Sequence, residues 1–191
     1  MKNNLNYTDV VFINPSVGGN YQSLQSKYTA IEPPTWALLL AESMRDSGFK
    51  VSIIDVNAEN LENSEVLERI KELKAKLVVF VVYGQNVNAG TTNMEGATKL
   101  SGYLKKKDSN IKIAYIGSYV QALPIKALKE EKSIDFVFTN EGVYALKNIL
   151  KLEYLNNNEL AKIKGVAFRG QKEIIQNEPG AIVPNERMDL D

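Results

Sequence analysis

The chain of 191 residues contains no cysteine and no histidine. Without cysteine it can form no disulfide, no thiolate metal site, no iron–sulfur cluster and no cysteine nucleophile. Without histidine it lacks the commonest general base and metal ligand, so Ser-His and Cys-His catalytic arrangements are excluded as well. The most familiar catalytic and metal-binding side chains are therefore absent from this chain.

The sequence also lacks a charge excess and long hydrophobic runs. Lys plus Arg equals Asp plus Glu at 23 each, so nothing in the net charge indicates nucleic acid or an anionic membrane as a partner. No apolar run approaches the roughly 18 residues that span a bilayer, and the first residues contain no apolar core of signal-peptide length. We therefore expect a cytoplasmic protein without a membrane or nucleic-acid partner.

Five short apolar runs, rich in β-branched residues, alternate with segments of helical periodicity. The predicted strands are residues 9–14, 50–55, 77–83, 111–116 and 136–139, and the predicted helices are residues 35–47, 65–75, 91–107, 123–132 and 143–152. Strands that alternate with helices favour a parallel sheet with right-handed crossovers. The sequence predicts an α/β fold with a flavodoxin-like (Rossmann-like), doubly wound five-stranded parallel sheet in the order 2-1-3-4-5.

Three local patterns refine these elements. Trp36 recurs with other apolar residues at helical spacing, so we expect its ring in the core. Asn63 or Ser64 can cap the helix that follows, whereas Gly96 and Gly102 weaken the prediction of the third helix. About fifteen residues separate the first strand from the next helix, against the usual two to six, so this loop is either functional or disordered.

The pattern changes after residue 155. Residues 164–169 and 172–176, separated by Gly170-Gln171, predict a C-terminal β-hairpin. The residues after Glu178 contain two prolines and little apolar content, which is typical of a linker. The expected organisation is an α/β domain at residues 1–155, a hairpin appendage at 156–178 and a linker at 179–191.

Polar residues and glycines follow the predicted strands. They stand at Asn14-Pro15, Tyr83-Gly84, Gly117-Ser118 and Asn140 to Gly142. The carboxyl ends of parallel strands meet at one edge of the sheet, where open α/β sheets bind ligands. The Gly-x-Gly-x-x-Gly and P-loop patterns are both missing. What remains is a wide ledge of amide, hydroxyl and glycine positions, suited to a large, neutral ligand that carries amides.

The order of these motifs resembles the N-terminal cobalamin (B12)-binding domain of B12-dependent radical S-adenosylmethionine (SAM) enzymes. In that family the fourth strand typically ends in Gly-Gly, matched here by Gly117-Ser118, and the fifth in Gly-Glu-Gly-Glu, matched in part by residues 140–143. The resemblance implies a cobalamin-binding module of a methyltransferase or cyclase-like enzyme. The implied cofactor-binding residues are Asn14, Pro15, Asp55, Asn57, Tyr83, Gly84, Gln85, Asn86, Gly117, Ser118, Tyr119, Val120, Asn140, Glu141 and Gly142.

The resemblance also implies a division of labour among these residues. Gly84 and Gly117 would leave room for the nucleotide tail of the cofactor, because a side chain would block its approach. Amide and hydroxyl side chains would hydrogen-bond cofactor amides, and Tyr83 or Asn57 would lie beneath the corrin ring. Core packing remains an equal alternative for Tyr83, and capping of the next segment an equal alternative for Asp55.

Two departures from related patterns define what this chain can do. The Asp-x-His-x-x-Gly motif of other cobalamin modules, whose histidine ligates cobalt, aligns with Asp55-Val56-Asn57, so no histidine ligand is possible. The Cys-x-x-x-Cys-x-x-Cys motif is absent, so a 4Fe-4S cluster and S-adenosylmethionine would belong to the radical SAM barrel of a longer parent chain. We expect no catalytic residue and no protein metal ligand here. The alternative is a cofactor-free small-ligand or protein-interaction module on the same fold.

Overall fold

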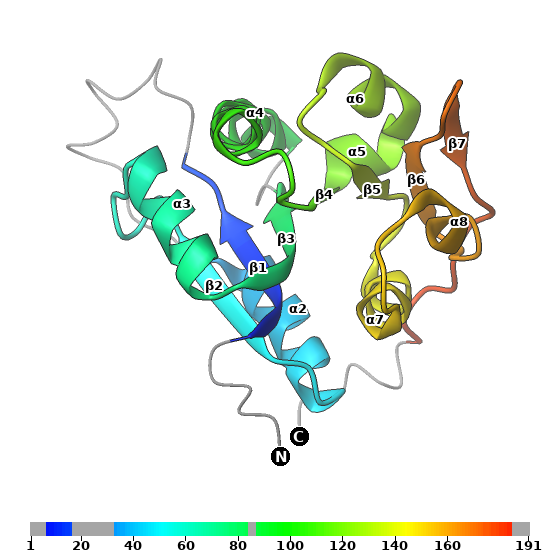
Figure 1. The fold of residues 1–191 in the computed structure, drawn as a ribbon, viewed down its shortest axis with the longest axis horizontal. Helices are drawn as coiled ribbons and strands as arrows, with labels where there is room; N and C mark the ends of the chain where they lie inside the picture. Colours follow the sequence, from blue (N-terminus) through cyan, green and yellow to red (C-terminus); the bar gives the residue numbers. More distant parts are fainter. Residues whose placement is uncertain (1–6, 17–32, 84–86, 185–191) are drawn as a thin grey trace.

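The structure, a computed structural model, describes residues 7–16, 33–83 and 87–184, with only the backbone described at residues 87–92. One seven-stranded sheet has the order β2-β1-β3-β4-β5-β6-β7 (Figure 1). Its strands are β1 Thr8–Asn14, β2 Val51–Asp55, β3 Ala75–Val81, β4 Ile113–Ile116, β5 Phe136–Phe138, β6 Val166–Arg169 and β7 Ile174–Gln176. The first five strands pair in parallel and the last two pair antiparallel. The predicted fold class and strand order are confirmed, and the predicted hairpin continues the same sheet.

Helices cover both faces of the sheet. They are α2 Thr35–Asp46, α3 Asn63–Glu72, α4 Val87–Lys107, α5 Ser118–Ala122, α6 Pro124–Glu130, α7 Val143–Lys151 and α8 Asn157–Leu160. One core lies under α3 to α6, and the other lies under α2, α7 and α8 (Figure 1). Successive residues of a strand point to opposite faces, so Val78 and Phe80 enter the first core and Val79 enters the second. Burial on both faces explains why the strands read as continuous apolar runs.

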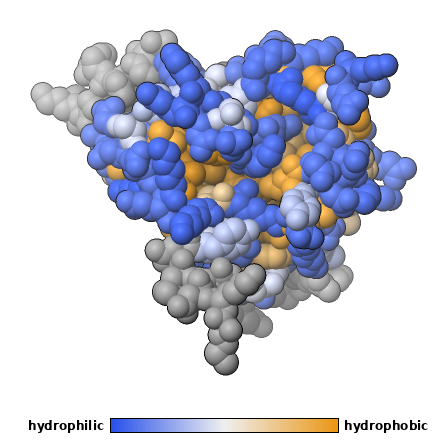
Figure 2. Space-filling view, in the orientation of Figure 1, coloured by the Kyte–Doolittle hydropathy of each residue, from blue (hydrophilic) through white to orange (hydrophobic). Residues whose placement is uncertain are grey.

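Figure 2 shows one face of the molecule, on which most of the surface is hydrophilic and hydrophobic residues are visible between the hydrophilic ones. On α2, Leu38 and Leu39 are exposed. Within the described ranges, no helix is both long and apolar enough to cross a membrane.

Trp36 is not a core residue. It is 47% exposed, while the buried residues of α2 are Ala37, Leu40, Ala41 and Met44. Trp36 precedes this buried stripe by one position, in the first turn, and its ring lies on Tyr83 instead. The prediction of a core tryptophan was wrong because apolar spacing alone did not show where the buried stripe begins.

Two helix boundaries also differ from the prediction. Glu62, rather than Asn63 or Ser64, caps α3 in a capping box with Glu65. The helix predicted at residues 123–132 is α6, and a short helix outside the predicted range, α5, precedes it; the two are separated by Leu123, which has non-helical φ and ψ angles of −133° and 54°. The following Pro124 explains the break, because a proline disfavours helical geometry in the residue before it.

Helix α4 runs through Gly96 and Gly102, the two glycines that weakened its prediction. A Cβ atom at Gly96 would overlap the carbonyl oxygen of Ser16, whereas a Cβ atom at Gly102 would meet nothing within 4 Å. Gly96 therefore allows α4 to pack directly against the backbone that leaves β1.

Candidate functional site

The carboxyl ends of the parallel strands place most of the described candidate residues along one edge. Asn14 is paired in register with Asp55 between β1 and β2, and Val81 with Ile116 between β3 and β4. The residues that follow these strands therefore lie side by side. Three predicted residues, Gly84, Gln85 and Asn86, fall outside the described part of the chain.

Asn14 and Asp55 join the first two strand ends. The Asn14 Nδ2 atom donates a hydrogen bond to Asp55 Oδ1 over 2.9 Å, and the Ala58 backbone N–H donates to the same oxygen over 3.0 Å. Asp55 thus caps the turn after β2, as its alternative interpretation suggested. Pro15 is buried, and Asn14 and Asn57 are half-buried. Asn14 and Asp55 are held in fixed positions at the rim of the edge.

Tyr83 lies at the centre of a second group. Its ring stacks on Trp36 with centroids 4.7 Å apart and planes inclined by 29°. The Gln121 Nε2 atom donates to the Tyr83 hydroxyl oxygen and, over 2.6 Å, to the backbone carbonyl of Asn140. The Asn93 side chain donates to the Tyr83 carbonyl over 2.9 Å. Tyr83 therefore connects four segments: the start of α2, the end of β3, α4 and α5.

Burial raises the pKa of Tyr83 to about 12, and the negative charge of Glu141 acts in the same direction. The hydrogen bond from Gln121 opposes this increase only in part, since it favours the phenolate. Tyr83 is consequently a neutral phenol near pH 7.

Gln121 and Trp36 belong to this group, although the sequence prediction of the site does not include them. Gln121 lies three residues after the predicted Ser118, and its backbone N–H donates to the Gly117 carbonyl over 3.0 Å in the first turn of α5. Helix α5, which the sequence prediction does not include, brings Gln121 to the edge. Trp36 was assigned to the core, which concealed its proximity to Tyr83.

Gly117 and Gly142 have structural reasons to be glycine. Gly117 has φ 155° and ψ 169°, a region accessible almost only to glycine, and a Cβ atom there would overlap the Val82 carbonyl group. Gly142 has φ 73°, and a Cβ atom there would lie 2.5 Å from the Cδ1 atom of Ile116. Glycine is therefore required at both positions because neighbouring strand ends pass too close for a Cβ atom, whether or not a ligand is bound.

The residues that follow Gly117 differ in their exposure. Ser118 is exposed at the edge. Val120 is fully buried in the core, and the half-buried Tyr119 donates its hydroxyl hydrogen to Glu130 over 3.3 Å. Of these three side chains, only that of Ser118 is presented to a ligand on the edge.

Asn140 and Glu141 bind the C-terminal part of the chain. The Asn140 Nδ2 atom donates to the carbonyl oxygens of Gly180 and Ala181 over 3.1 and 3.2 Å. The Val183 backbone N–H donates to Glu141 Oε2 over 2.8 Å. We call residues 178–183 the C-terminal strap. The side chains of Asn140 and Glu141, which the sequence analysis assigned to cofactor binding, therefore hold this strap instead.

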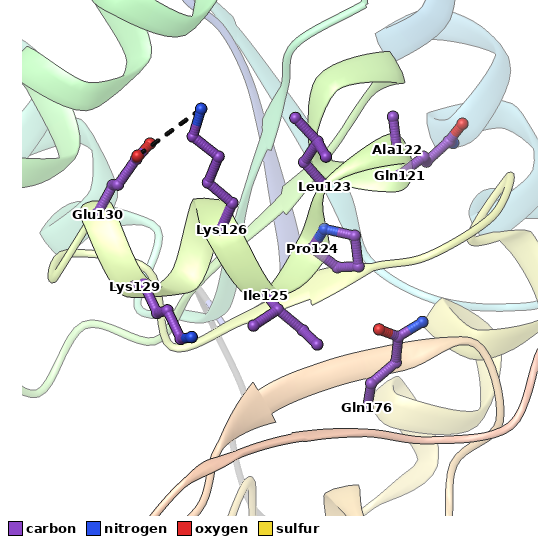
Figure 3. A pocket seen from close by; sticks show the side chains of 9 residues that line it. All are labelled: Gln121, Ala122, Leu123, Pro124, Ile125, Lys126, Lys129, Glu130 and Gln176. Carbon is purple, nitrogen blue, oxygen red and sulfur yellow. Dashed lines mark ion pairs between the residues drawn. The ribbon is translucent and has the colours of Figure 1, made fainter.

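A groove of about 580 Å³ lies beside the edge, between the α5–α6 corner and β7 (Figure 3). Leu123 and Ile125 are exposed in it, and Lys126 forms an ion pair with Glu130 over 3.9 Å. Its lining residues are Gln121, Ala122, Leu123, Pro124, Ile125, Lys126, Lys129, Glu130 and Gln176. The groove meets the group around Tyr83 only at Gln121.

The described residues include no cluster of three or more carboxylates that could hold a metal ion. The edge presents amide and hydroxyl groups and one aromatic pair instead. This arrangement can hold a neutral, polar ligand through hydrogen bonds and stacking.

Comparisons with known proteins agree with this geometry. The chain is 29% identical over 153 residues to the anaerobic magnesium-protoporphyrin IX monomethyl ester cyclase of Synechocystis sp., covering 79% of this chain and 29% of that protein. It is 25% identical over 153 residues to an uncharacterized methyltransferase of Pyrococcus horikoshii, covering 80% of this chain and 31% of that protein. The chain thus spans about a third of the length of these curated relatives.

Two solved structures share the fold. The radical S-adenosylmethionine methyltransferase TsrM from Kitasatospora setae, with cobalamin and a 4Fe-4S cluster bound, aligns with a TM-score of 0.68 at 14% identity, covering 94% of this chain and 30% of that chain. The cobalamin-dependent S-adenosylmethionine radical enzyme OxsB aligns with a TM-score of 0.66 at 15% identity, covering 94% and 23%. The model of the B12-binding domain family matches residues 23–150, well over half of the chain. The chain therefore belongs to the B12-binding domain family.

Proposed function

We propose that this chain is the cobalamin-binding part of a B12-dependent radical SAM enzyme of the methyltransferase or cyclase-like type. The observation that carries the proposal is the amide-rich carboxyl edge within a chain of the B12-binding family. The names of the relatives support it, since they include a cyclase and methyltransferases, and both solved neighbours are described with cobalamin bound.

The side chains at the edge fit this cofactor. A corrin ring carries amide side chains at its periphery, and neutral amides and hydroxyls such as those of Asn14, Gln121 and Ser118 can pair with them. The stacked rings of Trp36 and Tyr83 offer an aromatic surface beside them. No histidine exists in the chain and Tyr83 is a neutral phenol, so cobalamin would bind without a histidine ligand and without a phenolate from Tyr83.

The assignment of individual residues follows from their environments. Asn14, Asn57, Tyr83 and Ser118 would contact the cofactor through side chains, and Gly84, Gln85 and Asn86 are retained from the resemblance. The other candidates would contribute backbone groups and shape, because their side chains are buried or bonded elsewhere. These are Pro15, Asp55, Gly117, Tyr119, Val120, Asn140, Glu141 and Gly142.

The chemistry of the parent enzyme would require more than this chain. Bound cobalamin supplies a cobalt centre that can carry a methyl group. The 4Fe-4S cluster and S-adenosylmethionine would be held by a radical SAM barrel, the proposed partner within the same parent chain. The share of the curated relatives that this chain spans, 29% and 31%, leaves room for such a domain.

A hydroxocobalamin titration followed by desalting tests the proposal directly. We expect the protein fraction to retain the pigment and to show the visible spectrum of cobalamin without a nitrogen ligand on its lower face. The proposal fails if this chain and a longer chain that includes a Cys-x-x-x-Cys-x-x-Cys segment both remain colourless. That result would favour the cofactor-free module.

A pair of serine variants locates the site. Gly117→Leu is unsuitable because any side chain there meets the Val82 backbone. Ser118→Tyr instead places a ring on the exposed carboxyl edge, and we expect it to weaken cobalamin binding at least tenfold. Ser109→Tyr is the matched control, since Ser109 is exposed in the α4–β4 connection at the opposite edge. Equal affinities in the two variants would place the ligand elsewhere.

A further inference from the structure

The C-terminal strap is attached to the domain at several points. The Gly165 backbone N–H donates to the Glu178 carbonyl over 2.7 Å, and the Lys164 and Glu178 side chains form an ion pair over 2.9 Å. A Cβ atom at Gly165 would lie 3.2 Å from the backbone nitrogen of Gly180, so the two backbones nearly touch. Together with the bonds from Asn140 and Glu141, these contacts hold the strap across the loop that follows β5.

Three polar groups of Asn140 form hydrogen bonds in three directions. Its Oδ1 atom accepts a hydrogen bond from the Gly142 N–H over 3.0 Å, at the start of α7. Its Nδ2 atom holds the strap through Gly180 and Ala181. Its backbone carbonyl accepts from the Gln121 amide that also bonds the Tyr83 hydroxyl. One residue thus connects the strap to the aromatic pair on the edge.

We propose that Asn140 is a positioning residue that couples the course of the C-terminal strap to the Gln121–Tyr83–Trp36 group at the carboxyl edge. The part of this proposal that concerns cobalamin rests on the proposed function. Through Asn140, the direction in which the chain leaves the domain sets the position of the Gln121 amide, and therefore the shape of the surface offered to the cofactor. A pull on the strap from beyond residue 183 would reach the ligand surface by this route.

The test uses nuclear magnetic resonance on the ¹⁵N-labelled chain without cofactor. Trp36 is the only tryptophan, so its indole N–H gives a single, unambiguous resonance next to Tyr83. The side-chain amide of Gln121 is the second reporter. Hydrogen exchange of the Val183 and Gly165 backbone amides reports separately whether the strap is attached, because both amides donate in strap contacts.

Asn140→Asp is the informative variant. Its carboxylate still accepts from the Gly142 N–H but can no longer donate to Gly180 and Ala181, whose carbonyl oxygens it repels. We expect the Val183 and Gly165 amides to exchange about tenfold faster, as the loss of about 1.4 kcal/mol of hydrogen bonding predicts. The Gln121 and Trp36 resonances shift at the same time, and hydroxocobalamin binds about tenfold more weakly.

Two further variants keep the test decisive. Val183→Pro removes the N–H that reaches Glu141 and leaves Asn140 intact, so it releases the strap from its other end; the Gln121 and Trp36 resonances are expected to move in the same direction. Lys164→Gln removes an exposed ion pair of the strap, which contributes little, and both reporters stay at their wild-type positions.

The coupling is disproved if the Gly165 amide exchanges faster in both Asn140→Asp and Val183→Pro while the Gln121 and Trp36 resonances remain unshifted. Because these signals are recorded without cofactor, they test the coupling even where the wild-type chain fails to retain hydroxocobalamin. That failure would count against the proposed function alone.

Discussion

Tyr83 illustrates, at the residue scale, how burial determines the chemistry of one side chain. Its phenol packs against Trp36, accepts a hydrogen bond from Gln121, and has its pKa raised to about 12. A phenol in this state can donate its own proton and cannot act as an anionic ligand near pH 7. Tyr83 is therefore suited to support a neutral ligand and unsuited to coordinate a metal ion.

The raised pKa of Tyr83 predicts a specific pH dependence. The unfolded chain loses this proton near pH 10 and the folded chain near pH 12, so the stabilisation is complete below pH 10 and is lost as the pH rises towards 12. We expect the free energy of unfolding to fall more steeply between pH 10 and 12 in the wild-type chain than in Tyr83→Phe. Urea titrations at several pH values measure both slopes. Parallel slopes would mean that the Tyr83 hydroxyl is not shielded from water.

The candidate residues at this edge could be predicted from the sequence only where strand ends mark them. Asn14, Tyr83 and Ser118 follow apolar runs directly, and parallel topology then brings them together. Gln121 could not be found in this way, because its position depends on where a five-residue helix begins. The bonds of Asn140 to the strap join residues about 40 positions apart, and no local pattern encodes such a contact.

At the scale of the elements, Gly96 and Gly102 of α4 have opposite roles. Alanine is the better helix former by about 1 kcal/mol, so Gly102→Ala should raise the free energy of unfolding by about that amount, since its Cβ atom meets open space. Gly96→Ala should lower it by about 2 kcal/mol, because the new methyl group overlaps the Ser16 carbonyl and forces the helix from the sheet. Urea unfolding of the two variants decides the matter. A stabilising Gly96→Ala would show that α4 does not pack against this segment.

A buried hydroxyl group joins α4 to the sheet. The Ser101 hydroxyl lies 2.7 Å from the Tyr115 hydroxyl and 2.7 Å from that of Ser133, and all three residues are buried. We expect Tyr115→Phe and Ser101→Ala each to lower the free energy of unfolding by about 1–2 kcal/mol. The double variant should lose about 1 kcal/mol less than the sum, since both changes remove the same bond. A double-mutant cycle in urea measures this coupling, and strict additivity would contradict the network.

The hydrophobic pattern predicted the element types well, because strands buried on both faces, such as β1 and β3, consist of continuous apolar residues. The ends of the elements were less predictable. Glu62 caps α3 through a reciprocal bond with Glu65, and Pro124 separates α6 from the unpredicted helix α5 through its effect on Leu123. Such features depend on single hydrogen bonds and steric contacts, which carry little weight in a pattern that extends over ten residues.

At the scale of the whole molecule, the C-terminal hairpin completes the sheet. Val166 and Phe168 of β6 enter the core beneath α2 and α7, and Ala167 enters the opposite core. The Asn177 side chain donates to the carbonyls of Leu160 and Ile163 over 2.8 and 2.7 Å, which ties the end of β7 to the segment around α8. The hairpin therefore contributes to both cores. The boundaries predicted at residues 155 and 178 stay predictions.

This shared core predicts that the hairpin and the parallel sheet unfold together. Phe168 is fully buried, so Phe168→Ala should lower the free energy of unfolding by about 3–5 kcal/mol. Ile175 faces Phe168 in the β6–β7 register but is 38% exposed, and Ile175→Ala should cost about 1 kcal/mol. Urea unfolding is followed by circular dichroism and by Trp36 fluorescence, because Trp36 lies on α2, outside the hairpin. In a single folding unit Phe168→Ala shifts both transitions equally. A Trp36 transition that stays in place while part of the dichroism is lost would show that the hairpin unfolds separately.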